Sequence, residues 1–246
     1  MKVTLIVPVL YEEGQLSSTL ERLAALRDRL DLEILLVVDV PDPSRLDASR
    51  GHNDPIAQRV GATSFYRPGR RGVGSALREG FARSTGDVVI PFMGDECDDA
   101  GDIPRLVDAI VDGWDVVAGS RYMPGGRIVG NTMKQRLSRL YGFLVRTVGG
   151  PKIHDVSNAF KAYRRTVIES VDTVAESFDI SVELTVKAHR AGFSVGEIPT
   201  RWTNRQLGTS SWRFGSEVRR YLRWLVLAAR PMSPQRAAAV APGDRP

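Results

Sequence analysis

The sequence is poor in cysteine and histidine, which limits the kinds of site it can contain. Its 246 residues include a single cysteine, Cys97, so the chain cannot form an internal disulfide. The three histidines, at positions 52, 154 and 189, lie far apart and show no metal-ligand spacing. No serine nucleophile elbow is present either. These absences argue against a disulfide-stabilised domain, a structural zinc site and a serine or cysteine hydrolase, and they predict a cytoplasmic protein.

Long apolar runs are also missing. The longest apolar stretch near the end of the chain, residues 222–229, is interrupted by Arg223. It is far shorter than the roughly 20 residues that span a bilayer. The amino terminus reads as a strand from its first residues and lacks the pattern of a signal peptide. The sequence therefore predicts a soluble or peripheral protein without a membrane-spanning helix.

Positive charge is in modest excess, with a net charge of +5, so an anionic partner is expected. The sequence has no basic run interleaved with aromatic residues and no zinc-finger spacing, so nucleic acid is not expected as a partner. The scattered arginines suit phosphorylated metabolites or anionic lipid better.

Short apolar runs alternate with helical patterns in the first half of the chain. Runs of valine, isoleucine and leucine flanked by helices are typical of a parallel sheet with both faces covered. The predicted strands are residues 3–9, 32–40, 63–68, 87–93 and 114–120, and the predicted helices are 15–30, 73–84 and 103–113. The predicted fold class is α/β, with a mostly parallel, doubly wound sheet whose ligands bind beyond the carboxyl ends of the strands.

The pattern changes from residue 131 onward. The expected elements are a basic helix at 131–149, a strand at 158–165, a helix at 180–192, a strand at 193–202 and a helix at 216–230. The end of the chain lacks apolar periodicity and is expected to be disordered. We therefore predict one domain over residues 1–214, an amphipathic helix over 215–230 and a disordered tail over 231–246.

Residues 92–104, FMGDECDDAGDIP, follow a predicted buried strand and carry five carboxylates: Asp95, Glu96, Asp98, Asp99 and Asp102. Because like charges this close repel one another, a cation is expected among them. The polar segments PVLYEE and DVPDPS follow the first two strands, so three polar loops converge at one edge of the sheet. The alternative is a solvated acidic loop whose Asp102 caps the next helix.

Six motifs occur in a recognisable order: IVPVLYEEGQL, VDVPDPS, GRRGVGSALREGFARSTGD, the acidic loop, DVVAGSRYMPGG, and EIPTRW followed by R..G.S. This order resembles family-two glycosyltransferases of the GT-A fold, in particular the polyprenol-phosphate (dolichol-phosphate) mannosyl- and glucosyltransferases. The resemblance covers residues 3–214.

The resemblance implies a nucleotide-sugar donor site at the ends of the first strands. The residues that it implies are Pro8, Tyr11, Glu12, Asp39, Arg71 and Gly74. Glu12 would accept hydrogen bonds from the nucleotide, Tyr11 would stack, and Asp39 would contact the base. Gly74 would let the backbone approach the nucleotide beside Arg71. The alternatives are a polar turn after the first strand and a plain helix N-terminus at the glycines.

The resemblance also implies that the acidic loop binds Mg²⁺ or Mn²⁺, which bridges the two phosphates of the donor. Gly94-Asp95-Glu96 stands where the family has Asp-x-Asp. Asp95 is therefore the first expected ligand, followed by Asp98 and Asp99, with Glu96 less favoured. Asp155 would be a further carboxylate on the metal side or the acceptor side.

Arg121 and Arg205 match arginines that contact phosphates in the family, and with Asp95 and Asp98 they are the implied catalytic residues. The implied contacts of an acceptor phosphate are Lys134, Arg136, Ser138 and Ser210. Ser211 occupies the position of a family lysine, so one cation near the diphosphate is missing. A solvated basic helix face is the alternative for residues 134–139.

Together these residues predict a metal-dependent, inverting transfer of a hexose from a nucleoside-diphosphate sugar to a polyprenyl, dolichyl-type phosphate. An ionised phosphate can attack without a general base, and no dedicated base is evident. One alternative is a hydroxyl acceptor, with Asp155 or Glu183 as the base. Another is a catalytically weak sugar-nucleotide-binding or scaffold protein, because the acidic motif is altered and the lysine is missing.

The predicted helix at 216–230 combines arginines with Trp224 and other apolar residues. This composition is typical of a helix that lies on an anionic membrane surface. It would make the protein peripheral on the inner face of the cytoplasmic membrane. A helix packed on the domain shares this pattern, and docking onto a separate membrane subunit is a third possibility.

Overall fold

The structure, a computed structural model, describes residues 1–11, 14–70, 72–130, 133–203 and 214–231, and only the backbone of residues 214–217. The predicted disordered tail, residues 231–246, lies outside the described residues except for Pro231.

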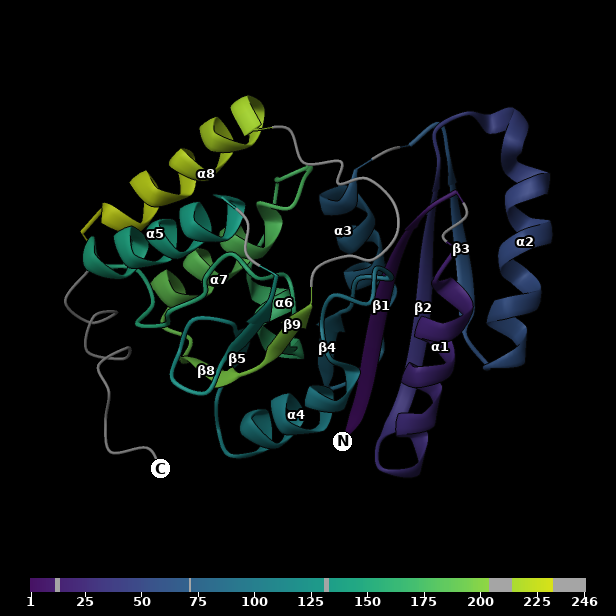
Figure 1. Ribbon diagram of the computed structural model, residues 1–246, viewed down its shortest axis with the longest axis horizontal. Coiled ribbons are helices and arrows are strands. Elements are labelled where there is room, and N and C mark those ends of the chain that lie inside the picture. The colour runs from purple at the N-terminus through teal and green to yellow at the C-terminus, as the bar shows by residue number, and fades with distance from the viewer. Residues whose placement is uncertain (12–13, 71, 131–132, 204–213, 232–246) are drawn as a thin grey trace.

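A seven-stranded sheet forms the centre of the molecule, with the strand order β3-β2-β1-β4-β7-β5-β8 (Figure 1). Its strands are β1 (Lys2–Leu10), β2 (Asp31–Val40), β3 (Thr63–Pro68), β4 (Val88–Pro91), β5 (Val116–Ser120), β7 (Lys161–Arg164) and β8 (Val195–Pro199). Six of them run parallel, and β7 runs antiparallel to both β4 and β5. The predicted α/β class with a mostly parallel sheet is confirmed.

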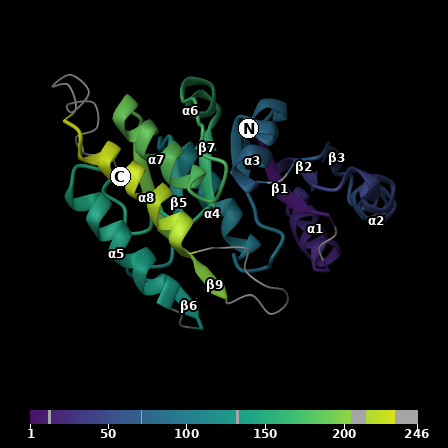
Figure 2. The same ribbon diagram turned by 90° about the horizontal axis from the view of Figure 1, so that it is seen from above.

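The helices lie in two layers, one on each face of the sheet. They are α1 (Leu16–Ala24), α2 (Leu46–Arg59), α3 (Val73–Arg83), α4 (Ile103–Val111), α5 (Met133–Thr147), α6 (Arg165–Ser170), α7 (Ile180–Ala191) and α8 (Phe214–Ala229). Side chains of α1, α2 and α4 share one core cluster with the sheet, and those of α3 and α7 share the other. Helices α5 and α8 lie side by side outside α7 (Figures 1 and 2).

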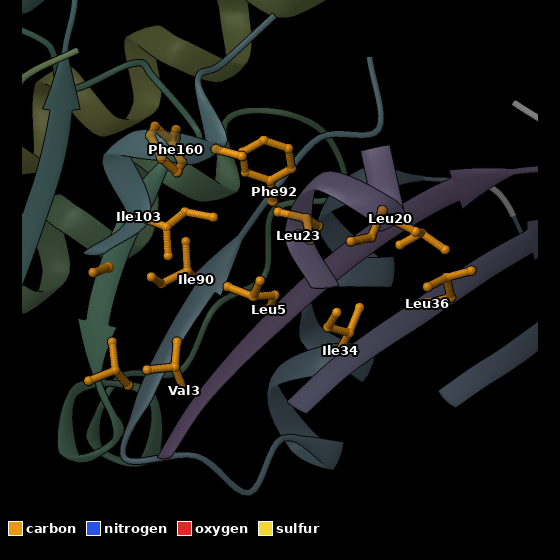
Figure 3. Packing of buried hydrophobic residues seen from close by; sticks show 14 of the residues in the cluster. Val3, Leu5, Leu20, Leu23, Ile34, Leu36, Ile90, Phe92, Ile103 and Phe160 are labelled. Carbon is orange, nitrogen blue, oxygen red and sulfur yellow. The ribbon is translucent and has the colours of Figure 1, made fainter. Parts of the chain in front are cut away.

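Successive side chains of a strand point to opposite faces of the sheet, so both faces need a covering layer of helices. Leu5 of β1 joins the cluster under α1, whereas its neighbour Ile6 joins the cluster on the opposite face. Figure 3 shows Leu5 and Ile90 beneath Leu23 of α1. Strands that are buried on both faces need continuous apolar runs, and this is the pattern found in the sequence.

Three elements were not expected from the sequence: α2, α6 and the short strand β6 (Arg127–Val129). Helix α2 contains Pro55, and its buried positions include Ser49 and Asn53 rather than apolar residues alone. Both side chains donate to the carbonyl of Tyr11, at 3.0 Å and 2.7 Å. This helix therefore docks through hydrogen bonds, which an apolar pattern cannot reveal.

The predicted strand at 193–202 is divided in two. β8 ends at Pro199, and β9 (Arg201–Thr203) pairs with β6 in a separate parallel ladder. The break at Thr200 places β9 against the acidic loop. There Thr203 N donates to Cys97 O at 2.8 Å, and Asp98 forms an isolated bridge with Trp202.

Helix α8 packs on the domain through the side of the helix that carries Trp224. The indole is 2% exposed, and its Nε1 donates to Asp179 Oδ2 at 2.8 Å. Tyr141 of α5 meets Tyr221 of α8 edge to face, with ring centroids 5.2 Å apart. The packed-helix alternative is thus correct for Trp224, which cannot contact a membrane. Over the described part of the chain, no helix is both long and apolar enough to cross a bilayer.

We expect the substitution Trp224→Phe to destabilise the fold, because it leaves the buried Asp179 carboxylate without its donor. The loss should be about 2–3 kcal/mol, the usual range for a hydrogen bond to a buried charged group. Urea unfolding measures it, with Trp114→Phe as the control for a half-buried tryptophan. Equal losses in the two variants would contradict this role of the indole N–H.

Candidate active site

The acidic loop borders a cavity of about 330 Å³ beyond the carboxyl end of β4. The residues that line it are Arg22, Asp95, Glu96, Cys97, Asp98, Asp99, Arg201 and Thr203. The sequence did not point to Arg22 or Arg201, because each lies in an ordinary helix or strand pattern far from the acidic motif. The cavity therefore combines carboxylates with two arginines.

Three of the carboxylates have local hydrogen-bond partners. Asp95 Oδ1 accepts from Cys97 N at 3.2 Å, and Glu96 Oε1 accepts from the Ser18 hydroxyl at 2.6 Å. Asp99 Oδ1 accepts from Gly101 N at 2.9 Å and so caps the short turn at Ala100–Asp102. These bonds fix the conformation of the acidic loop at the edge of the cavity.

Asp98 differs from its neighbours because its carboxyl is almost completely buried. Burial raises its pKa to about 7, Arg121 opposes this, and the charges of Asp95 and Asp155 add to it. The amide of Asn158 donates to Asp98 Oδ1 at 3.3 Å. The negative charge at this position is therefore incompletely compensated, which is the condition under which a cation binds favourably.

The chemistry of the cavity fits a divalent cation that is held by few protein ligands. Within the described ranges, no three histidine, cysteine or carboxylate side chains are arranged to hold a metal by themselves. Mg²⁺ and Mn²⁺ accept hard oxygen ligands, and Mg²⁺ is usually held by one or two carboxylates plus phosphate oxygens. Asp95 and Asp98 are the residues that would hold such an ion.

Asp155 is engaged by Arg121, and the expectation that it ligates metal stays a prediction. Its Oδ2 accepts from Arg121 Nε at 2.6 Å and from Arg121 N at 3.1 Å, and its Oδ1 accepts from Arg121 Nη2 at 3.0 Å. Burial would raise the pKa of Asp155, but the charge and hydrogen bonds of Arg121 hold it below its usual value. The carboxylate orients the arginine.

Arg121 is the centre of a hydroxyl-rich cluster. Its Nη2 lies 3.3 Å from the hydroxyls of both Ser138 and Ser157, which are 2.5 Å from each other. Tyr122 donates to Ser138 at 3.1 Å, and the guanidinium lies 5.9 Å from the ring centre of Trp202. The sequence predicted Arg121 and Ser138, whereas Ser157, Tyr122 and Trp202 were missed although their motifs had been identified.

The other predicted acceptor residues divide into two groups. Lys134 and Arg136 are exposed near the start of α5. Arg205 and Ser210 lie outside the described residues, as do Glu12 and Arg71 of the predicted donor site. Their roles therefore stay predictions.

The ends of β1 and β2 form a second polar group. Asp39 Oδ2 accepts from Gly72 N at 2.8 Å, and Asp39 Oδ1 lies 3.3 Å from Arg67 Nε. Burial raises the pKa of Asp39, while Arg67 and the Gly72 N–H oppose the rise. Among the described residues, Asp39 Oδ1 and Arg67 Nη1 are buried without a hydrogen-bond partner. Buried polar atoms without a hydrogen bond call for an explanation, and here they mark the end of β2 as a polar site.

Tyr11 adopts a left-handed backbone with φ of 56°, which is unfavourable for a bulky residue. Hydrogen bonds from Ser49 and Asn53 to its carbonyl hold it there. Its hydroxyl accepts from Asp42 N at 3.0 Å, and its ring lies 4.4 Å from the Arg45 guanidinium. Pro8, half-buried within β1, precedes this turn. The ring is thus fixed beside the end of β2.

Gly74 lies against the backbone of residues 175–176, which leaves no room for a side chain. A Cβ at this position would lie 2.3 Å from Ala175 O, and its N donates to Glu176 O at 3.1 Å. The missing side chain therefore makes room for the protein's own 175–176 segment, and the expected approach of a nucleotide to Gly74 stays a prediction.

The carboxylates proposed as bases for a hydroxyl acceptor are engaged in the fold. Glu183 is fully buried; it accepts from Val174 N and Ala175 N, and it pairs with Lys187 Nζ at 2.6 Å. Asp155 is occupied by Arg121.

Comparison with known proteins gives a family match over most of the chain. A family model described as "Glycosyl transferase family 2" matches residues 4–172. Polyprenol monophosphomannose synthase of Mycolicibacterium smegmatis is 34% identical over 162 residues, covering 63% of this chain and 61% of that protein. Dolichol-phosphate mannosyltransferase of Pyrococcus furiosus is 29% identical over 226 residues, covering 91% of this chain and 62% of that protein. The chain therefore spans less than two thirds of the length of either relative.

A third relative matches along nearly its whole length. Undecaprenyl-phosphate mannosyltransferase of Micrococcus luteus is 29% identical over 243 residues, covering 94% of this chain and 96% of that protein. Among solved structures, glucosyl-3-phosphoglycerate synthase of Mycobacterium tuberculosis, crystallised with Mn²⁺, UDP and glucosyl-3-phosphoglycerate, superposes with a TM-score of 0.65. It is 17% identical, and the match covers 94% of this chain and 81% of that one. At this identity the likeness shows the fold alone, and it agrees with the predicted GT-A fold.

The raised pKa of Asp98 predicts a pH-dependent affinity for Mn²⁺. Below about pH 7 the ion must displace a proton from this carboxyl, so affinity should fall about tenfold for each pH unit below 7 and level off above it. Calorimetric titration with Mn²⁺ alone between about pH 5.5 and 8.5 tests this, because the range brackets the pKa of Asp98. Asp98→Asn should lose the dependence, and Asp102→Asn, on the same loop, should keep it. An affinity that stays constant through pH 7 would contradict the assignment.

Proposed function

The chain belongs to glycosyl transferase family 2, and on this premise we propose that it moves a hexose from a nucleoside-diphosphate sugar to a polyprenyl phosphate. The reaction is metal-assisted and inverts the configuration of the transferred sugar. The names of three relatives, which are polyprenol-, dolichol- and undecaprenyl-phosphate mannosyl enzymes, support this acceptor class. The solved neighbour that contains Mn²⁺ and UDP supports a nucleotide donor and a divalent ion.

The hydrogen bonds of the two candidate bases, Asp155 and Glu183, are the observation that favours a phosphate acceptor over a hydroxyl acceptor. A hydroxyl acceptor needs a base to remove its proton, whereas a phosphate monoester is largely ionised at pH 7 because its second pKa is about 6. Asp155 is held by Arg121 and has a lowered pKa, and Glu183 is spent on two backbone amides and Lys187. Asp98 has a raised pKa, but it is assigned to the metal and must be deprotonated there. The arrangement therefore favours a phosphate acceptor.

Each part of the site has a task in this proposal. Asp39, which is paired with Arg67 at the end of β2, contacts the nucleotide. Asp95 and Asp98 hold the divalent ion, which when bound compensates the charge that develops on the departing diphosphate. Arg121, with the Ser138 and Ser157 hydroxyls, faces the acceptor phosphate.

Two exposed helices give the protein a surface suited to a membrane that contains such an acceptor. On α8, Val218, Leu222 and Val226 are exposed at spacings of four residues and so form one stripe. On α5, Leu140, Phe143 and Leu144 are exposed. Basic residues border both sets: Lys134, Arg136, Arg139, Arg219, Arg220 and Arg223. Apolar stripes bordered by arginine and lysine are complementary to an anionic lipid surface.

The central test is a transfer assay with polyprenyl phosphate, a set of nucleotide sugars and Mn²⁺. The wild type should form polyprenyl-phosphate hexose. Arg121→Lys should lower kcat roughly 100-fold, because lysine cannot form the bidentate hydrogen bonds to Asp155 that position the positive charge of Arg121. Arg105→Lys, which alters an exposed arginine paired with Asp102, is the control. Transfer to a hydroxyl acceptor only, or no transfer with any donor, would refute the proposed function.

Co-sedimentation with phosphatidylcholine vesicles, with and without phosphatidylglycerol, tests the membrane surface. Binding should require the anionic lipid and weaken with salt. Arg219→Ser with Arg223→Ser should weaken it about 30-fold, at about 1 kcal/mol for each basic residue. Leu222→Glu should also weaken it. Val111→Glu should not, because Val111 is 61% exposed and belongs to α4, a helix that lies away from α5 and α8 (Figure 1). No binding at low salt would contradict the membrane surface and leave the packed-helix and membrane-subunit alternatives.

A further inference from the structure

A fully buried lysine lies beside the loop that connects the two parts of the site. Lys161, the first residue of β7, has no exposed surface. Lysine is almost never fully buried unless its charge is satisfied, because removing an ammonium from water is costly. Its presence therefore calls for a physical explanation within the fold.

The surroundings of Lys161 match the three donors of an ammonium. Its Nζ donates to Val156 O at 2.9 Å, to Asn158 O at 2.5 Å and to Ser181 Oγ at 2.5 Å. Ser181 Oγ in turn donates to Asn158 O at 2.6 Å, which adds α7 to the network. Residues 156 and 158 lie outside strands and helices, so the lysine satisfies carbonyls that no sheet ladder reaches.

The segment held in this way, residues 155–158, contributes to both parts of the site. Asp155 binds Arg121 through both of its oxygens, and the Ser157 hydroxyl lies 2.5 Å from that of Ser138. Asn158 donates to Asp98 at 3.3 Å and to Gly119 O at 2.9 Å. A shift of this segment would therefore move the Arg121 cluster and the partner of Asp98 together.

We infer that Lys161 is a positioning residue for the transfer reaction, whose ammonium fixes residues 155–158 so that Arg121 and Asp98 are aligned at the same time. The inference rests on the proposed function, because it assigns the acceptor phosphate to Arg121 and the metal to Asp98. Lys161 touches neither substrate and acts through the backbone carbonyls of the segment. Its loss should therefore lower kcat more than it weakens donor binding.

Lys161→Met removes the donors and keeps an unbranched side chain. The matched control is Arg164→Met at the other end of the same strand, where Arg164 also donates to two backbone carbonyls, those of Ile110 and Trp114. Lys161→Arg restores a cationic donor. Each variant is assayed at a temperature where urea unfolding shows it to be folded, and amide hydrogen exchange is followed by mass spectrometry over residues 153–160.

We expect Lys161→Met to lower kcat roughly 10- to 100-fold, the scale of a small misplacement of reacting groups, with the donor KM nearly unchanged. Exchange over residues 153–160 should become faster in Lys161→Met but not in Arg164→Met. Arg164→Met should keep a kcat close to that of the wild type even if it is equally destabilised, and Lys161→Arg should recover most of the lost activity. Ser181→Ala, which removes one partner without a large cavity, should show a smaller loss in the same direction.

The inference would be overturned if kcat fell in proportion to the loss of unfolding free energy, and by the same proportion, in Lys161→Met and Arg164→Met. A Lys161→Arg enzyme as impaired as Lys161→Met would overturn it as well, since side-chain volume would then explain the loss. If Lys161→Met does not fold, an unchanged kcat in Ser181→Ala overturns it instead. A wild type without transfer activity would refute the proposed function separately, and hydrogen exchange would then decide alone whether Lys161 holds the segment.

Discussion

The buried pair of Arg121 and Asp155 is the interaction on which one half of the site depends. The arginine follows β5 and the aspartate precedes β7, and the same guanidinium contacts Ser138 of α5 and lies over Trp202 of β9. Removing one member of a buried pair usually costs about 3–5 kcal/mol, because the other charge is left uncompensated. The pair therefore connects β5, β7, α5 and β9. Replacing either residue of the pair would disrupt the cluster around Arg121.

Compensation of charge differs between the two halves of the site. Arg121 and Asp155 form a buried ion pair. Lys161 donates three hydrogen bonds to neutral groups, but burial still lowers its pKa to about 7. Asp98 accepts from the Asn158 amide at 3.3 Å. Burial and the charges of Asp95 and Asp155 raise its pKa, although Arg121 opposes the rise. The Arg121–Asp155 pair holds its half of the site in place. The incompletely compensated negative charge lies at Asp98, where a cation would bind.

The sequence predicted the parts of the fold that depend on apolar periodicity and did not predict the parts that depend on hydrogen bonds. The first five strands follow from their valine, isoleucine and leucine runs, but α2 was missed because Ser49 and Asn53 provide its buried contacts. In the site, Asp98 and Arg121 could be found from motifs. The engagement of Asp155 could not, because only tertiary structure brings residues 121 and 155 together.

The antiparallel direction of β7 has a consequence for how this molecule can diversify. Because β7 runs against its neighbours, its amino end lies beside their carboxyl ends, and the segment that precedes it enters the site. The polar groups assigned to the donor come from residues before position 100, whereas the Arg121 cluster comes from residues 120–203. Changes within residues 120–203 could therefore alter the acceptor during evolution, while the donor residues before position 100 stay the same.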